Sequence, residues 1–246
     1  MHTGVGFYGR DAADGGSRNV HISGFTISGD VRERIGTDQV NAIGGALSDS
    51  TIDGLYLQHT KMGVWLDGPM RNVRVTDNII VDQIADALNF HTGVTDSVVP
   101  NNFVRNTGDD GLAMWSEGIA DARNTFTRNT VQSPVLANGI AIDGGTDNTV
   151  SHVHFRDIRV DGTGASVVSA RTAGSASFAN VDARNVGAVG VHNCGSFRFT
   201  PGGSEFSLTD LGANDDGGWL GPWLLPNTIT CADRPPVVPP PPPSHW

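Results

Sequence analysis

The chain has 246 residues, of which 38% are hydrophobic and 17% are charged, so it has room for one domain and a tail. Its 26 acidic and 16 basic residues give a formal charge of −10, which speaks against nucleic acid or an anionic membrane surface as a partner. No apolar run is long enough to span a membrane, and neither a phosphate-binding glycine loop nor a zinc-ligand spacing occurs.

Short segments that alternate apolar and polar residues recur along the chain, which is typical of β-strands. They lie, in chain order, at 20–27, 52–57, 73–80, 98–104, 126–131, 150–155 and, more weakly, 178–181. Equivalent positions in these segments follow one another at a nearly regular interval, at Ile22, Ile52, Val75, Val99, Phe126, Val150 and Phe178. This regular interval predicts that the strands belong to one repeated unit.

A second short strand trails the first in the repeat, at 63–66, 87–90, 111–114, 139–142 and 189–192. Glycine or asparagine interrupts nearly every candidate helix. Repeats of this length, built only from short strands and turns, predict an all-β fold in which residues 1–206 form a parallel β-helix, a solenoid of stacked coils. The alternative is a β-sandwich, but a sandwich has no reason to keep its strands in phase over six units.

Three aspartates occupy matching places in two neighbouring repeats. When segment 85–91 is overlaid on segment 109–115, Asp86 falls on Asp110, with Asp109 beside them. Stacked coils lie about 4.8 Å apart, so the three carboxylates should converge and hold at least one proton towards neutral pH. Cleavage of a glycosidic bond needs one protonated acid and one carboxylate, which stand about 6.5–9.5 Å apart in inverting enzymes, a range that side chains splaying from neighbouring coils can reach.

The alternative for these aspartates is a structural one, because Asp and Asn favour tight turns. It is the interpretation that we favour for four other aspartates, Asp82, Asp96, Asp121 and Asp147. It suits the three clustered aspartates less well, since like charges stacked on neighbouring strands destabilise a sheet.

A further column of residues should stand at the end of the second strand of successive coils. It consists of Asp67, His91, Trp115 and Asp143, which follow one another at the interval of the repeat. A tryptophan can stack on a sugar ring, while Asp and His can bind its hydroxyls, so we predict that this column contacts the substrate, together with Trp65 and His59. The alternatives are that Trp115 and Trp65 belong to the core and that His59 is structural.

The run from Arg105 to Ser116, RNTGDDGLAMWS, resembles the core of glycoside hydrolase family 87, the bacterial α-1,3-glucanases (mutanases) and mycodextranases. Further stretches similar to that family lie at 4–9, 58–70, 85–94, 129–134 and 138–142, and the resemblance covers roughly residues 4–200. It implies a right-handed parallel β-helix that cleaves α-1,3-glucosidic bonds in an α-glucan, endo-acting and with inversion. It also implies that Asp86, Asp109 and Asp110 are the catalytic residues, with acid and base unassigned among them.

Two other functions stay open. A polygalacturonase-like β-helix hydrolase also uses a paired Asp-Asp after a third Asp, but the Gly-His-Gly and Arg-x-Lys elements that grip a uronate are missing from this chain, and its negative charge would repel a polyanion. A non-catalytic β-helix that binds carbohydrate at a surface is the second alternative, because a fold does not fix a function.

The two ends of the chain carry expectations of their own. The chain opens on what resembles the middle of a family 87 domain, so we expect the N-terminal coils and a signal peptide to be missing from a secreted, monomeric protein. After the β-helix, we expect an irregular cap over 207–234 and a proline-rich linker over 235–246. Cys194 and Cys231 form either a disulfide across this region or two unrelated thiols.

The expected partner is thus a polysaccharide, with neither nucleic acid nor a membrane. We expect no required cofactor and no metal among the site residues. The many Asp and Asn turns nevertheless leave room for a structural calcium ion.

Overall fold

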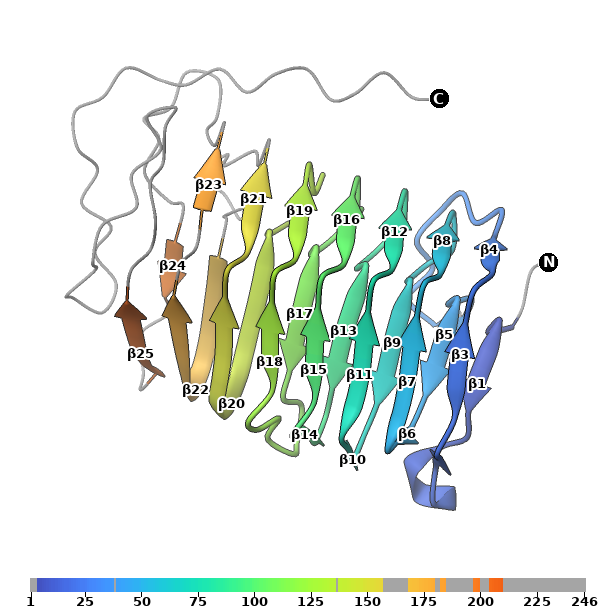
Figure 1. Ribbon diagram of the computed structural model, residues 1–246, viewed down its shortest axis with the longest axis horizontal. Coiled ribbons are helices and arrows are strands. Elements are labelled where there is room, and N and C mark those ends of the chain that lie inside the picture. The colour runs from blue at the N-terminus through green and yellow to red at the C-terminus, as the bar shows by residue number, and fades with distance from the viewer. Residues whose placement is uncertain are drawn as a thin grey trace.

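The computed structural model describes residues 4–37, 39–135 and 137–156, and beyond them the backbone of the strands at 168–179, 182–184, 197–199 and 204–209. The chain is a parallel β-solenoid of about five turns, and the described residues include one short 3-10 helix, η1 (Ala12–Asp14) (Figure 1). The predicted all-β parallel β-helix is thereby confirmed. The expected cap beyond Thr209, the proline-rich tail and both cysteines lie outside the described residues.

Three columns of parallel strands run along the solenoid. Figure 1 shows its coils side by side, from β1 at one end towards β25 at the other. The first column holds β1 (Phe7–Gly9), β5 (Ile43–Gly45), β9 (Val64–Asp67), β13 (Leu88–His91), β17 (Leu112–Trp115) and β24 (Phe197–Phe199). The second holds β3 (His21–Ser23), β7 (Ser50–Asp53), β11 (Val73–Thr76), β15 (Val98–Pro100), β18 (Thr125–Thr127) and β25 (Ser204–Thr209). The third holds β4 (Thr26–Ser28), β8 (Tyr56–Gln58), β12 (Ile79–Val81), β16 (Phe103–Arg105), β19 (Thr130–Gln132), β21 (His154–Arg156) and β23 (Asp182–Arg184).

Two long strands join the first and second columns without a break, β20 (Ile140–Ser151) and β22 (Val168–Ala179). Two short pairs add to the bend between these columns, β2 (Ser17–Arg18) with β6 (Leu47–Ser48) and β10 (Met70–Arg71) with β14 (Val94–Thr95). Each coil therefore packs three strands around one interior.

The register between coils follows the spacing of the sequence. The positions expected to be equivalent share one register from coil to coil, at Ile22, Ile52, Val75, Val99, Phe126, Val150 and Phe178; between β11 and β15 the pair Arg74 and Val98 sets it. The interior consists of such stacked apolar side chains, and the rings of Phe90 and Phe126 meet edge to face at 5.3 Å. Among the described residues, no helix is long and apolar enough to cross a membrane.

The segments expected to be single first strands are in fact two strands each, joined at a corner. The break falls where one residue has a positive φ, such as Asp77 at 57° between β11 and β12 and Asn101 at 59° between β15 and β16. Asp and Asn tolerate this left-handed conformation better than most residues. The buried positions shift by one residue at the corner, from Val73 and Val75 before it to Asn78 and Ile80 after it. Because the first buried residue after the corner is a polar asparagine, the apolar pattern alone does not reveal the break.

The residue after the corner forms an asparagine ladder inside the solenoid. Asn78 donates from Nδ2 to Oδ1 of Asn102 at 2.9 Å, and Asn102 donates from Nδ2 to Oδ1 of Asn129 at 3.1 Å. All three are buried, and their Nδ2 groups also donate to the backbone carbonyls of Ile52, Val75 and Val99, so that buried polar groups at this corner have partners. The ladder thus holds successive coils in register at the corner between the second and third columns.

Candidate active site

The three aspartates stand together where coils enter the first column. Asp86 precedes β13 and Asp110 precedes β17, and the pairing of Leu88 with Leu112 puts them one above the other. Carboxylate oxygens of Asp86, Asp109 and Asp110 lie within 4.8 Å of one another. The predicted stacking of the three carboxylates is confirmed, but these oxygens are closer than the separation of about 6.5–9.5 Å expected of inverting pairs.

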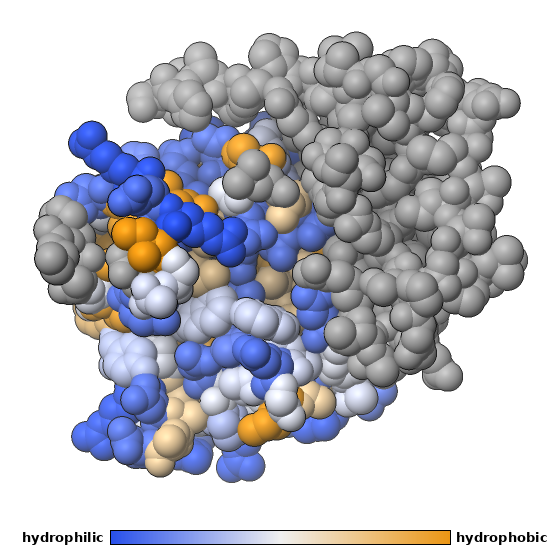
Figure 2. Space-filling model, turned by 180° about the vertical axis from the view of Figure 1, so that it is seen from behind, coloured by the Kyte–Doolittle hydropathy of each residue, from blue (hydrophilic) through white to orange (hydrophobic). Residues whose placement is uncertain are grey.

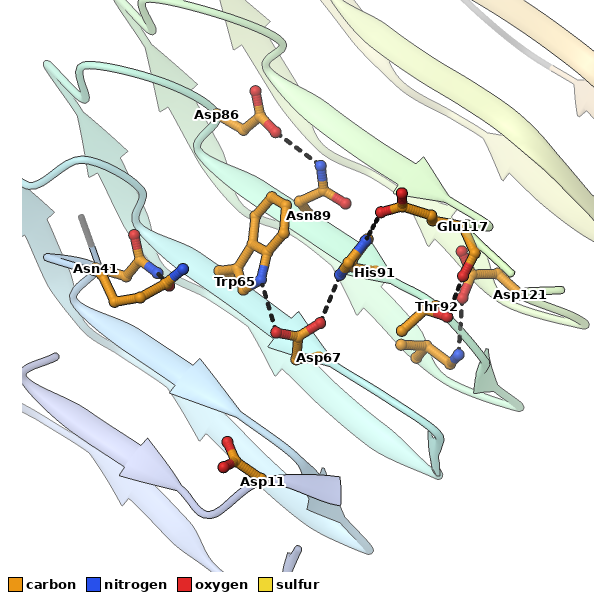
Figure 3. Close-up of polar contacts among 12 residues, drawn as sticks. Asp11, Asn41, Trp65, Asp67, Asp86, Asn89, His91, Thr92, Glu117 and Asp121 are labelled. Carbon is orange, nitrogen blue, oxygen red and sulfur yellow. Dashed lines mark hydrogen bonds and ion pairs between the residues drawn. The ribbon is translucent and has the colours of Figure 1, made fainter. Parts of the chain in front are cut away.

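Asp86 and Asp110 are buried and bonded to the coil that follows each of them. The backbone N–H of Asp110 donates to Oδ1 of Asp86 at 3.1 Å, and the side chain of Asn89 donates to Oδ2 of Asp86 at 2.7 Å (Figure 3). Asn138 donates to Oδ1 of Asp110 twice, from its backbone N–H at 2.8 Å and from Nδ2 at 2.7 Å. These bonds fix both carboxyl groups at the start of their strands.

Asp109 is held differently from its two neighbours. It is half-buried and forms an ion pair with Arg34, which belongs to the irregular stretch between β4 and β5. Its neighbour Thr107 is buried and donates from its hydroxyl to the backbone carbonyl of Asp109 at 2.9 Å. The site therefore contains two buried carboxyl groups and a third that is ion-paired and partly open to solvent.

Burial sets the proton affinity of the two inner aspartates. It is the largest cause that raises the pKa of Asp86 well above its usual value, and the charges of Asp110 and Asp109 add to it. Burial, followed by the charge of Asp109, raises the pKa of Asp110 to about 7, against the bonds from Asn138. Since two carboxylates this close cannot both ionise easily, the pair retains a proton at neutral pH.

The aspartates line a cavity of about 530 Å³. Figure 2 shows the molecule from behind the view of Figure 1, the side of β9, β13 and β17, where hydrophilic and pale residues surround a hollow. Trp65, Trp115 and Asp143 line the same cavity, as do Asn41 and Asn89. Both asparagines are buried, and the structure gives their Oδ1 atoms no hydrogen-bond partner.

The predicted outward column is present in the first column of strands. Asp67 pairs with His91, His91 with Trp115, and Trp115 with Asp143. The imidazole of His91 and the indoles of Trp65 and Trp115 form a triangular cluster, with the His91 centroid 4.8 Å from both indoles and the indoles 6.2 Å apart, edge to face. Stacking of this kind makes one continuous aromatic surface beside the aspartates.

Two carboxylates hold the ring of His91 from its ends. Asp67 contacts Nδ1, and Glu117 lies 3.0 Å from Nε2 (Figure 3). Burial favours the neutral ring, but the hydrogen bonds of Asp67 and Glu117 outweigh it and raise the pKa of His91. A positively charged ring beside two indoles is a favourable cation–π arrangement.

The remaining predicted residues fall in different places. Trp115 is 41% exposed and Trp65 is partly exposed and points outward, so neither is a core residue. The indole Nε1 of Trp65 donates to Oδ2 of Asp67 at 3.2 Å. His59 does not line the cavity: it sits at a corner with a φ of 54°, exposed, with Nε2 4.0 Å from Asp82.

Of the four aspartates interpreted as turn residues, Asp82, Asp96 and Asp147 have a positive φ of 54–55° and do form corners. Asp121 is different, because it is fully buried. It accepts the backbone N–H of Val94 at 2.7 Å and the hydroxyl of Ser116 at 3.2 Å. Asp121 therefore has a structural role like the other three, but through its buried carboxyl group in the loop between β17 and β18 and not through a positive φ.

Sequence reasoning missed several residues of the site. Asn138 carried a signal, because the overlay that places Asp86 on Asp110 places Asp110 on Asn138 when it is carried one repeat further. Arg34 and Asn41 carried none, because they lie in the irregular stretch between β4 and β5, outside the repeat.

Comparison with solved structures places this fold beside glycoside hydrolase family 87. The catalytic domain of Agl-KA superimposes with a TM-score of 0.63 and 22% identity, over 77% of this chain and 37% of that one. The catalytic unit of a thermostable GH87 α-1,3-glucanase from Streptomyces thermodiastaticus strain HF3-3 gives 0.52 and 26%, over 89% and 57%. A GH87 α-1,3-glucanase variant in complex with nigerose gives 0.60 and 18%, over 68% and 31%.

These likenesses confirm the predicted fold relationship to the GH87 catalytic domains. The chain spans only 31–57% of the length of these three solved chains. No curated protein matches the sequence significantly. A family model matches residues 9–164, which is more than half of the 246-residue chain. By that match, the chain belongs to the family described as periplasmic copper-binding protein (NosD).

Proposed function

We propose that this chain is a glycoside hydrolase that cleaves α-1,3-glucosidic bonds in a neutral α-glucan. The observation that carries the proposal is the set of three carboxylates within 4.8 Å of one another, in a cavity that two tryptophans also line. The likeness of the fold to α-1,3-glucanase catalytic domains, one of them bound to nigerose, supports the choice of linkage.

The surroundings of the aspartates suggest a division of roles. Asp110 is the proposed acid: with a pKa of about 7, it holds a proton near neutral pH and can still give it to the leaving glycosidic oxygen. Asp109, which is ion-paired and partly exposed, is the proposed base that takes a proton from water while the water oxygen bonds to the anomeric carbon. Asp86 shares the proton of the buried pair and positions Asp110 by accepting its backbone N–H.

Inversion is part of the proposal, and the stereochemistry of the product tests it. Oxygens within 4.8 Å of one another leave less room for a water than an inverting pair provides. Asp109 would have to turn away from Asp110 when a sugar enters. Proton NMR of the first products gives the answer, because an inverting enzyme releases the β-anomer from an α-glucan and a retaining enzyme releases the α-anomer.

A neutral substrate fits the charge of the cavity better than a uronate. Asp143 adds a fourth carboxylate to the three aspartates. Both cationic side chains that line the cavity, Arg34 and Lys61, already have partners. Arg34 pairs with Asp109, and Lys61 donates from Nζ to the backbone carbonyl of Gly36 at 2.8 Å. A polyanion would therefore meet repulsion there. Since a polymeric glucan does not cross a membrane, we also propose that the protein acts outside the cell.

The family description names copper, but the site is a poor match for that metal. Among the described residues, the group that could hold an ion consists of Asp86, Asp109 and Asp110. Carboxylates suit Ca²⁺, Mg²⁺ or Mn²⁺, whereas copper prefers thiolate, thioether or imidazole ligands. The three methionines among the described residues, Met62, Met70 and Met114, are buried, and the proposed reaction uses no metal.

Incubation with insoluble α-1,3-glucan, followed by a reducing-sugar assay, tests the proposal. We expect release by the parent chain and at least a hundredfold slower release by Asp110→Asn. Asp147→Asn, at an exposed corner, is the matched control and should keep the parent activity. The same assay with nigeran and with polygalacturonate distinguishes an α-1,3-glucanase from a polygalacturonase-like hydrolase. Binding of glucan without release by the parent chain would contradict catalysis and favour the binding protein.

A further inference from the structure

A second cavity, of about 780 Å³, adjoins the one that holds the aspartates. Gln39, Asn41 and Trp65 line both cavities. The two cavities are therefore parts of one depression along the first column of strands, which continues from the aspartates towards β1. The additional lining comes mainly from β1, β5 and the residues that flank β1 or precede β5, with Tyr8 and Asp11 among them.

Two aromatic residues stand in line on this part of the column. Tyr8 pairs with Gly44, and Gly44 pairs with Trp65, so the two rings are two strand spacings apart, about 9–10 Å. Gly44 keeps the space between them open. A Cβ on Gly44 would lie 3.2 Å from a methyl of Val5 and 3.4 Å from Cδ2 of Tyr8, so a larger side chain would fill the gap.

Each ring has a carboxylate beside it. The hydroxyl of Tyr8 donates to Asp11, a bond that raises the pKa of Tyr8 to about 12 and keeps the phenol neutral. The indole N–H of Trp65 donates to Asp67. Tyr8 is 53% exposed, so its ring face is available to a ligand. An aromatic face can pack on the apolar side of a sugar, while carboxylate oxygens accept hydroxyl protons.

We propose that Tyr8, Trp65, Asp11 and Asp67, here called the Tyr8–Trp65 platform, bind the part of a neutral glucan chain that extends from the aspartates towards β1. The occupant is the same chain that the aspartates act on, because the two cavities share a wall. This inference rests on the proposed function for the identity of the sugar.

Asn41 gives independent support to a sugar at the junction of the cavities. It is 3% exposed, it lines both cavities, and the structure gives its Oδ1 no hydrogen-bond partner. A buried carbonyl oxygen without a partner is unfavourable. A sugar hydroxyl at the junction would supply the missing donor.

Binding measured in the Asp110→Asn background separates this proposal from turnover. Soluble α-1,3-linked gluco-oligosaccharides of two and of five units are titrated calorimetrically. We expect Tyr8→Ala to weaken binding of the pentasaccharide about tenfold, which corresponds to the loss of one stacking contact, and to leave the disaccharide unchanged. Tyr8→Phe should retain most of the affinity. Tyr56→Ala, at the other tyrosine of the chain, which lies on β8 in the third column, is the matched control.

Filling the space above Gly44, between Tyr8 and Trp65, tests the proposal a second time without removing an aromatic ring. Gly44→Leu should weaken binding of the pentasaccharide as much as Tyr8→Ala does. Its circular dichroism spectrum should match that of the parent, which shows that the variant is folded. Pentasaccharide affinity that is unchanged in both variants, or lost equally in Tyr56→Ala, would overturn the platform. A chain that binds the pentasaccharide through Tyr8 but releases no sugar when Asp110 is intact would refute the hydrolase and leave the platform standing.

Discussion

The buried carboxyl group of Asp121 should make the stability of this protein depend on pH. Asp121 is fully buried and accepts the backbone N–H of Val94 and the hydroxyl of Ser116. Burial raises the pKa of Asp121 to about 6, although these hydrogen bonds favour the ionised form. Asp121→Asn keeps an acceptor for Val94 and offers an N–H to the oxygen of Ser116, and it removes the ionisation.

The direction of this pH dependence follows from the pKa of Asp121, which is higher in the folded protein than in the unfolded chain. The stabilisation from the protonated carboxyl group is fully present below the unfolded pKa of about 3.9 and is lost as pH rises through about 6. A difference of about two pKa units corresponds to roughly 3 kcal/mol of unfolding free energy. The Asn variant has no such loss, so its stability relative to the parent should rise by about that amount between pH 4 and pH 8.

Denaturant unfolding of parent and variant at pH 4 and pH 8 measures this difference. The titrations of Asp86 and Asp110 occur in both proteins and cancel in the comparison. Asp147→Asn, at an exposed corner, should show no such change between the two pH values. A free-energy gap between parent and Asp121→Asn that is equal at both pH values would refute the reasoning.

Three further predictions concern the core and the site. Phe126→Ala should lower the unfolding free energy by about 3–5 kcal/mol, because the ring is fully buried; a midpoint shift smaller than that of an exposed-residue variant would contradict it. The kcat/KM on α-1,3-glucan should fall as pH rises through about 7, where Asp110 loses its proton, and a rate that rises there would exclude it as the acid. Gly111→Ala should lower both Tm and activity, since its Cβ would lie 2.4 Å from a valine methyl of the neighbouring coil. Gly36→Ala, with open space around that position, is the control for Tm, and an equal loss of Tm in both variants would contradict the steric argument.

Sequence spacing alone determined the coil-to-coil contacts of this protein. In a parallel solenoid, a residue lies beside the one that occupies the same place in the next repeat, so the interval of the repeat was enough to stack Asp86 on Asp110 and His91 on Trp115. The same logic, carried one repeat further along the chain, would have found Asn138. Register was predictable because it depends on repeat length and not on the path of the loops.

Only the tertiary structure decided what lies outside the repeat. The ion pair of Arg34 with Asp109 comes from an irregular segment whose path no pattern specifies. The burial of Asp121 depends on the loop that follows β17. The apolar pattern does not reveal the left-handed corner at Asp77, because the buried residue that follows it is the polar Asn78. The joining of the two cavities depends on which side chains reach across several coils. Such contacts depend on the three-dimensional path of segments that do not repeat, so the spacing that fixes the register does not determine them.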